Sequence, residues 1–188
     1  GTLDNKKVHR LVLEGMFGPV HKVTTTKALM DSGRLTTLNI MCVMLKYNEE
    51  IRKAQKNKTY QEEMDFLVSN EKRNKFIRNL AVKCEGNTLV LFQFVEKHGK
   101  ILYELIKDKV HENRKVFFVY GGTDVEVRES IRAITEKEKD AIIVASYGTF
   151  STGINIRNLH NIIFASPSKS RIRNLQSIGR GLRIGDDK

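Results

Sequence analysis

The sequence predicts an α/β protein built on a doubly wound parallel sheet with helices on both faces. Two observations lead to this fold class. Short runs that are apolar except for Gln93 occur at 89–94, 116–120, 141–145 and 162–165, and such runs are typical of strands buried in a parallel sheet. Helical patterns separate them, as expected when helices cross over between parallel strands. The length of 188 residues allows one well-buried domain plus an extension, or two small domains.

Helical and strand patterns both occur before residue 59. Threonines at 24–26 are expected to cap a short helix that ends at Gly33. Residues 37–46 are apolar on both faces, which favours a strand. The charged residues 48–58 are expected to form a loop or an exposed helix. This part of the chain is therefore predicted to add one helix and one strand to the fold, and a second helix if 48–58 is helical.

Capping patterns and apolar stripes predict the helices of the alternating part. Thr59 and Glu62 have the spacing of a capping box, which predicts a helix to about Val68. Thr123 and Glu126 have the same spacing and predict a helix to about residue 134. Apolar residues at helical spacing predict two further helices, near 71–83 and near 101–106.

The charge of the chain favours a polyanionic partner. The net charge is +11, for which nucleic acid is the first candidate. The stretch 141–185 contains no acidic residue and six cationic ones: Arg157, Lys169, Arg171, Arg173, Arg180 and Arg183. A basic surface that serves only solubility normally mixes both signs. This stretch is therefore expected to contact phosphates.

The composition also limits the other classes of function. Cys42 and Cys84 lie beside apolar residues and are expected to be reduced core thiols of a cytoplasmic protein. The five histidines show no metal-ligand spacing, so no metal site is predicted. The apolar runs are far too short to cross a bilayer, so no membrane partner is expected.

The carboxyl ends of the strands are the predicted ligand site, because doubly wound sheets bind ligands there. Hydroxyl groups and glycines gather in two loops that reach this edge, around residues 121–123 and 146–155. Backbone amides and hydroxyls there can hold phosphate oxygens, and an ordinary polar turn is an equal alternative. The predicted nucleic-acid-binding residues of these loops are Gly122, Thr123, Ser146, Thr149 and Thr152. Tyr120, Tyr147 and Phe150 can stack on bases, although packing against their own loops is favoured.

A final helix, which Ser168 is predicted to cap, carries the most specific pattern. Gln176, Arg180 and Arg183 share one face of this helix, and apolar residues around it would anchor it to the core. Two guanidinium groups one turn apart can clamp a phosphate chain, because their planar forks match its oxygens. A solvated basic face is the alternative. The chain has no phosphate loop and no Asp-Glu pair after an apolar strand, so it is not expected to hydrolyse a nucleotide alone.

Together these residues resemble the second RecA-like motor domain of the superfamily 2 helicases. The run Gln176-x-x-Gly179-Arg180-x-x-Arg183 matches motif VI of the family. Ala145-Ser146 followed by Gly153-Ile-Asn155 resembles motif V, although the family usually has Thr and Asp where this chain has Ser and Asn. Residues 89–94 resemble motif IV. The resemblance implies that 23–188 form the C-terminal helicase domain and that 1–22 are the tail of the first motor domain and its linker.

The resemblance also implies roles for single residues. Arg180 and Arg183 would reach ATP bound on the N-terminal RecA-like domain of the same protein and act in catalysis. Gln176, Gly179, Gly153 and Asn155 would contact the nucleotide. Motif VI takes two of the six cations of the acid-free stretch, which leaves Arg157, Lys169, Arg171 and Arg173 as candidates. Of these, Lys169, Arg171 and Arg173 are predicted to bind nucleic acid.

The similarity implies an ATP-dependent helicase of recombination, replication and repair. Its substrates would be branched DNA, such as forks and Holliday junctions, and RNA–DNA hybrids, including R-loops. ATP and Mg²⁺ would be its cofactors, bound mainly by the first motor domain, and the enzyme is expected to be monomeric. Two alternatives stay open: an ATP-independent nucleic-acid-binding module, and an RNA helicase of the same superfamily.

Overall fold

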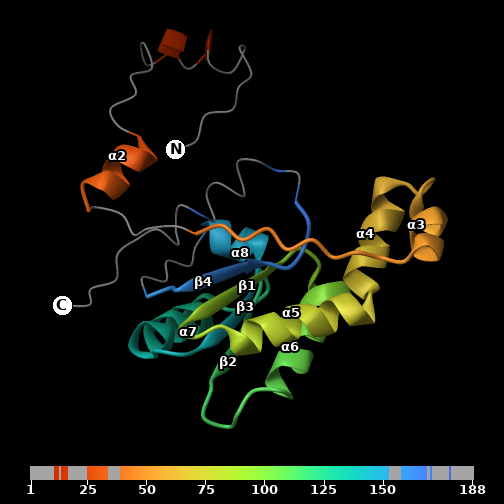
Figure 1. The fold of residues 1–188 in the computed structure, drawn as a ribbon. Coiled ribbons are helices and arrows are strands. Elements are labelled where there is room, and N and C mark those ends of the chain that lie inside the picture. The colour runs from red at the N-terminus through yellow and green to blue at the C-terminus, as the bar shows by residue number, and fades with distance from the viewer. Residues whose placement is uncertain are drawn as a thin grey trace.

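A sheet of four parallel strands forms the centre of the molecule (Figure 1). The computed structural model describes residues 11–12, 14–16, 25–33, 39–152, 158–168, 170 and 178. The strands are β1 (Thr88–Phe92), β2 (Val116–Val119), β3 (Ile142–Ser146) and β4 (Asn161–Phe164). They lie side by side in the order β2-β3-β1-β4, and each neighbouring pair is parallel. The predicted parallel α/β sheet is confirmed.

Four described α-helices precede the sheet in the chain, and the others connect its strands. In chain order they are α2 (Thr26–Asp31), α3 (Glu49–Gln55), α4 (Tyr60–Ser69), α5 (Glu71–Lys83), α6 (Lys100–Lys107), α7 (Val125–Lys137) and α8 (Tyr147–Thr152). A short π-helix, η1 (Val95–Gly99), leads directly into α6. The helices predicted near 71–83, 101–106 and 123–134 are confirmed within a few residues, and 48–58 contain the exposed helix α3. None of the described helices is long and apolar enough to span a bilayer.

The two central strands are buried along their whole length because helices pack on both faces of the sheet. Every residue of β1 and of β3 is buried. Residues of β1 alternate between the faces, as the period of two requires. On one face Val90 and Phe92 pack with residues of α5 and α6, and on the other Leu89 and Leu91 pack with residues of α7 and α8. The predicted coverage of both faces is therefore confirmed.

Polar side chains determine where α4 and α5 begin. The Thr59 hydroxyl accepts a hydrogen bond from the Glu62 N–H at 3.3 Å, and the Glu62 carboxylate accepts one from the Thr59 N–H at 2.8 Å. This is the predicted capping box. Asn70 ends α4 and begins α5, and its side-chain oxygen accepts a hydrogen bond from the Arg73 N–H at 2.9 Å. One residue thus separates the two helices and sets the angle between them.

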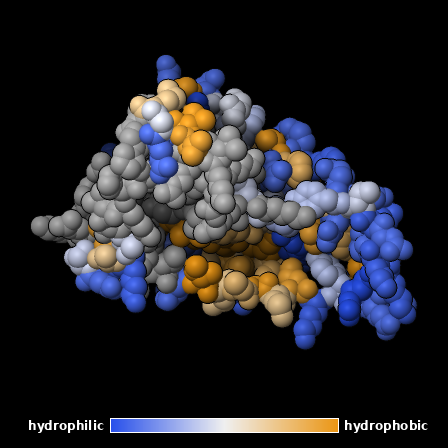
Figure 2. Space-filling model, turned by 90° about the horizontal axis from the view of Figure 1, so that it is seen from above, coloured by the Kyte–Doolittle hydropathy of each residue, from blue (hydrophilic) through white to orange (hydrophobic). Residues whose placement is uncertain are grey.

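The predicted strand at 37–46 is wrong for the residues that the structure describes. Residues 39–46 are exposed and pair with no strand of the described sheet, and a strand needs a partner for its backbone groups. Met41 and Met44 are more than four-fifths exposed. Figure 2 shows apolar side chains gathered along the middle of one face, where this segment crosses the molecule in Figure 1. Cys42, in the same segment, is exposed rather than a core thiol.

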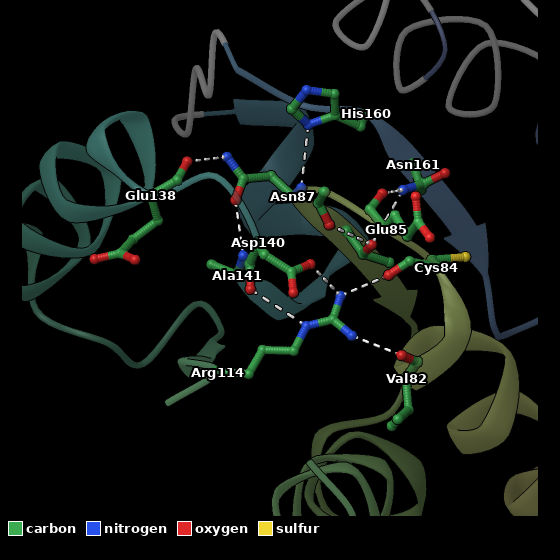
Figure 3. A network of polar contacts seen from close by, with 12 residues as sticks. Val82, Cys84, Glu85, Asn87, Arg114, Glu138, Asp140, Ala141, His160 and Asn161 are labelled. Carbon is green, nitrogen blue, oxygen red and sulfur yellow. Dashed lines mark hydrogen bonds and ion pairs between the residues drawn. The ribbon is translucent and has the colours of Figure 1, made fainter. Parts of the chain in front are cut away.

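A polar network joins the loops at the amino ends of the strands (Figure 3). The Asn87 side-chain nitrogen lies 2.7 Å from the Glu138 carbonyl oxygen and 2.8 Å from that of Asn158. The Asn87 oxygen accepts a hydrogen bond from the Ala141 N–H at 2.8 Å. The Asn87 backbone N–H donates to His160 Nδ1 at 3.1 Å. One buried amide therefore joins the start of β1 to the segments that precede β3 and β4.

Arg114 supports the same edge from the chain that precedes β2. Its guanidinium donates to the carbonyl oxygens of Val82 and Cys84, each at 2.7 Å, and forms an ion pair with Asp140 at 2.9 Å. Gly86 follows these carbonyls with a φ of +80°, and a Cβ there would lie 2.8 Å from the His160 ring. Only glycine satisfies both requirements. Side chains therefore hold the amino edge of the sheet, opposite the carboxyl edge where doubly wound sheets bind their ligands.

Candidate functional site

The carboxyl edge of the sheet brings together the segments that follow all four strands. These are Gln93 after β1, the turn 120–124 after β2, α8 after β3, and residues 165–168 after β4. β2 and β3 are neighbours in the sheet, so the two predicted ligand-binding loops that follow them lie next to each other.

The turn after β2 is built around Thr123. The Thr123 N–H donates to the Tyr120 carbonyl at 2.9 Å, and the Tyr120 N–H donates to the Thr123 hydroxyl at 3.1 Å. Gly122 is exposed, and a Cβ on it would lie 2.7 Å from the Tyr120 ring. The predicted capping box at Thr123 is wrong, because its hydroxyl is engaged by Tyr120 and α7 begins after Asp124. Of the two predicted contact residues, Gly122 is thus accessible and Thr123 is half-buried.

The segment after β3 is a helix where a loop was expected. Ser146 ends β3, and α8 follows without a connecting residue. The Ser146 and Thr149 hydroxyls lie 2.7 Å apart, and the Thr149 N–H donates to Ser146 Oγ at 3.3 Å. Both side chains are buried. Their hydroxyls therefore stabilise the first turn of α8, and their predicted contact with nucleic acid stays a prediction.

The aromatic residues of these loops pack within the protein. Tyr120 lies against Phe118, with ring centroids 5.4 Å apart, and Tyr147 lies against Phe164 at 6.2 Å. Tyr147 is buried. For these two tyrosines the packing alternative is confirmed, and the side chain of Phe150 lies outside the described part of the chain.

Sequence reasoning missed a polar cluster at the end of β4. We define the Ser166 cluster as the side chains of Arg73, Asn74, His98, Tyr147 and Ser166 with their partners. The Tyr147 hydroxyl donates to the Ser166 carbonyl at 2.8 Å, and Arg73 Nη2 donates to the Ala165 carbonyl at 2.5 Å. Both carbonyls of residues 165 and 166 are thereby bonded to side chains from other elements.

The hydrogen-bond partners of His98 determine which ring nitrogen carries its proton. The Asn74 side-chain nitrogen donates to the Val68 carbonyl at 2.8 Å, which leaves the Asn74 oxygen facing His98 Nε2 at 3.1 Å. Nε2 must therefore donate. His98 Nδ1 then accepts from the Ser166 hydroxyl at 2.9 Å, and Ser166 Oγ accepts from the Gln93 N–H at 3.0 Å. With a neutral His98 imidazole, each hydrogen bond in this series therefore has one donor and one acceptor.

The electrostatics of the cluster favour that neutral form. Burial lowers the pKa of His98 to about 4, and the positive charge of Arg73 acts in the same direction. Burial also lowers the pKa of the Arg73 guanidinium below its usual value, although the nearby Tyr47 and Tyr147 oppose this. At neutral pH the His98 ring is therefore uncharged and its hydrogen-bond directions are settled.

A sequence signal for part of this cluster exists. Asn74 lies on the same helical stripe as Ile77 and Ala81, so it is a polar residue on an apolar face. His98 and Ser166 are buried polar residues next to the ends of buried strands. Their partners lie far away in the chain, so the local pattern gives no sign of the contacts.

Most of the residues predicted to bind nucleotide or nucleic acid lie outside the described part of the chain. They are Gly153, Asn155, Lys169, Arg171, Arg173, Gln176, Gly179, Arg180 and Arg183. Thr152 is the last residue of α8. Ser168, the predicted cap of the final helix, is described, and its Oγ accepts a hydrogen bond from the Ser170 N–H at 3.3 Å. Of the rest of that predicted helix the structure describes only Ser170 and Ile178. Among the described residues, no group of His, Cys, Asp and Glu could hold a metal ion.

Comparisons with known proteins agree with this architecture. The helicase conserved C-terminal domain family matches residues 71–185. The ATP-dependent DNA helicase uvsW of Enterobacteria phage T4 is 43% identical over 186 residues, which cover 97% of this chain and 36% of that protein. The crystal structure of T4 UvsW matches with a TM-score of 0.62 over 71% of this chain and 27% of that one. The chain thus spans about a third of the curated relative's length, and its sheet has the RecA-like fold of that structure.

Proposed function

Because this chain belongs to the helicase conserved C-terminal domain family, we propose that it is the second motor domain of an ATP-dependent DNA helicase. The proposal rests on 43% identity, over 97% of the chain, to a protein named as such an enzyme. The matched range 71–185 includes every residue of the motif VI pattern. Residues 23–188 would form this domain, and 1–22 would belong to the end of the N-terminal RecA-like domain and the linker.

In this proposal ATP lies between the two motor domains. Arg180 and Arg183 stabilise the negative charge that develops on the transferring phosphoryl group, because their guanidinium groups stay charged and offer paired donors. Gln176, Gly179, Gly153 and Asn155 contact the nucleotide. Mg²⁺ would accompany ATP and be bound mainly by the first motor domain.

The nucleic acid would bind along the carboxyl edge. The exposed Gly122 offers its backbone there, and the six cations of 141–185 supply the charge that attracts phosphates. Thr123, Ser146, Thr149 and Thr152 would shape the loops that contact the strand, and Lys169, Arg171 and Arg173 would bind phosphates. Opening and closing of the cleft between the domains would then move the strand.

The substrates proposed for the intact enzyme are branched DNA and RNA–DNA hybrids, as in forks, Holliday junctions and R-loops. The enzyme would act as a monomer in recombination, replication and repair, in the cytoplasm, which is that of the host cell if the protein is phage-encoded. Unwinding of these structures would follow from coupling strand movement to ATP turnover.

The test is ATP hydrolysis by the intact protein with no nucleic acid, with single-stranded DNA, with a DNA fork, with an R-loop and with RNA. We expect turnover to rise with DNA and the fork and R-loop to be unwound. Stimulation by RNA alone would instead identify an RNA helicase. Salt-sensitive DNA binding without any turnover would identify a binding module and overturn the proposal.

A further inference from the structure

Helix α5 carries the largest excess of positive charge among the helices that the structure describes. Its 13 residues include five cations and one carboxylate. By contrast, α3 has two charged residues of each sign and α7 has three of each. A solvated helix face normally mixes the two signs, because pairs of opposite charge stabilise the helix and the surface. The charge of α5 is therefore better explained by a polyanionic partner than by solubility.

Three of the five cations have no carboxylate partner among the described residues. They are Lys72, Arg78 and Lys83. Lys75 differs from them, because its ammonium group forms an ion pair with Glu71. Arg78 Nε and Nη2 both donate to the Asn79 side-chain oxygen, at 3.1 and 2.9 Å. A neutral group thus orients the Arg78 guanidinium, and its positive charge is not neutralised by a carboxylate.

These cations lie on the outer side of α5 together with an exposed aromatic ring. At about 100° per residue, Lys72, Phe76 and Lys83 fall within about 40° of one another around the helix. Asn79, which holds Arg78, lies within about 20° of Lys72. Phe76 is 38% exposed, whereas the opposite side of the helix packs into the core. We define the α5 stripe as the side chains of Lys72, Phe76, Arg78 and Lys83.

Contacts at both ends of α5 show how the stripe lies relative to the sheet. In the first turn, Arg73 donates to the Ala165 carbonyl, which follows β4 at the carboxyl edge. At the other end, the Cys84 carbonyl accepts from Arg114 at the amino edge. Figure 1 shows α5 running along the outside of the sheet. At about 1.5 Å per residue the stripe is about 17 Å long, so it begins near the carboxyl edge and leads away from it.

Unpaired cations on both sides of an exposed ring have the composition of a surface for single-stranded nucleic acid. Such surfaces combine positive charges along the backbone with aromatic side chains on which bases stack. We infer that the α5 stripe binds a single-stranded segment that leaves the carboxyl edge, with its phosphates on the three cations and one base on Phe76. This inference rests on the proposed function, which makes nucleic acid the polyanion. It adds a contact surface outside the strand ends.

The first test measures binding of a single-stranded DNA oligonucleotide of mixed sequence to the intact protein, by fluorescence anisotropy at several salt concentrations. The variant replaces Lys72, Arg78 and Lys83 by alanine. Loss of three phosphate contacts should reduce the slope of log K against log salt by about 2. The control replaces Lys56, Lys137 and Lys139 by alanine, since these exposed lysines also have no carboxylate partner among the described residues and lie outside α5. Its slope should change much less.

The second test replaces Phe76 by leucine, which retains an apolar side chain and removes the ring. Loss of one stacked base should weaken binding by between about 5-fold and 150-fold. The salt slope should stay the same, because no charge is lost. Tyr60→Leu is the control, since it removes a ring that is 46% exposed on α4, a helix whose charged residues are all acidic. Its affinity for the oligonucleotide should not change.

The two tests together separate the inference from the proposed function. The midpoint of thermal unfolding, measured for each variant, should stay within a few degrees of the unmodified protein, because the replaced side chains lie at the surface. If the α5 variants change DNA binding no more than their controls do, the inference is overturned and the proposed function stands. An unmodified protein that does not bind single-stranded DNA would overturn both.

Discussion

Asn87 and Ala141 are 54 positions apart in the chain, and the Asn87 side-chain oxygen accepts a 2.8 Å hydrogen bond from the Ala141 N–H. This contact places the residue before β1 against the residue before β3, at the start of two neighbouring strands. The Asn87 amide nitrogen contacts carbonyl oxygens that precede β3 and β4 (Figure 3). A single side chain therefore aligns three strands at their amino ends.

Replacing Asn87 by alanine is expected to lower the free energy of unfolding by about 2–4 kcal/mol, because it leaves buried backbone groups without partners. Urea unfolding of the 188-residue chain measures the change. Asn79→Ala is the control, since Asn79 is exposed and its side-chain oxygen accepts from the neighbouring Arg78 guanidinium. Equal unfolding midpoints for the two variants would contradict a central role for Asn87.

The stability of the chain should fall as the pH decreases from 7 to 5, and His98 should account for part of the loss. Its pKa is about 4 in the folded protein, well below the usual 6.5. The unfolded chain therefore takes up a proton below pH 6.5, while the folded chain does so only near pH 4. The loss from this one group is about 2 kcal/mol between pH 7 and pH 5.

The measurement is urea unfolding at several pH values for the unmodified chain and for His98→Asn. The asparagine oxygen can accept from Ser166, so the variant keeps one contact without a titrating group. Its stability should depend less on pH in this window than that of the unmodified chain. An unchanged slope in His98→Asn would show that other groups cause the loss.

Cys42 should react with a thiol reagent faster than Cys84. Cys42 is exposed, whereas Cys84 is half-buried and burial raises the pKa of its thiol, with Arg114 opposing this shift. Since the thiolate is the reactive form, both effects slow Cys84. The rates are measured with DTNB on Cys42→Ser and Cys84→Ser, each of which retains one thiol. In urea the two rates should become equal, and faster reaction of Cys84 in the folded chain would contradict its burial.

In the intact enzyme, Arg180→Ala and Arg183→Ala should each reduce ATP turnover much more than they weaken ATP binding. Arginines that act on a phosphoryl transition state contribute about 10³–10⁵ to the rate. Arg180→Lys should restore little, because an ammonium group lacks the planar fork. Steady-state kinetics and nucleotide titration separate the two effects. Near-normal turnover in either alanine variant would assign that arginine to a solvated basic face.

Binding of single-stranded DNA should weaken steeply with salt, and Lys169, Arg171 and Arg173 should account for part of the slope. Each phosphate neutralised on a single strand contributes about −0.7 to the slope of log K against log salt. Replacing all three residues by alanine should therefore reduce the slope by about 2 and lower the affinity similarly for all sequences. Fluorescence anisotropy at several salt concentrations measures it.

The matched control for that variant replaces Lys53, Lys58 and Lys75 by alanine. It removes the same charge from exposed lysines that form ion pairs with glutamates within their helices or at a helix start. Its slope should change much less. Equal slopes for the two triple variants would place the path of the DNA elsewhere on the domain.

The sheet could be predicted from the sequence because β1 and β3 are apolar except for Thr88 and Ser146, a composition typical of strands covered on both faces. The same apolar pattern wrongly predicted a strand in the segment that includes 39–46. An apolar run shows that a segment can form a strand, but the partner strand lies elsewhere in the chain and leaves no local mark. The capping box predicted at Thr123 was wrong for another reason. The threonine hydroxyl accepts from the Tyr120 N–H, and α7 begins after Asp124.

The Ser166 cluster could not be predicted in the same way. His98 is 68 positions from Ser166, and Arg73 is 92 positions from the Ala165 carbonyl. Only the fold brings them together, and none of these residues belongs to a short motif. The motif VI pattern could be recognised from the sequence alone, because the spacing of Gln176, Arg180 and Arg183 lies within one short stretch.

The strand order has a consequence for how the chain is made. β1 pairs with β3 and β4, and both of these follow it in the chain, as does β2. During synthesis β1 leaves the ribosome first and has no partner until residue 142 has emerged. At about 5–20 residues per second, the apolar stretch 88–92 is without its sheet for several seconds. The newly made chain therefore has an interval in which this stretch is open to chaperones and to other nascent chains.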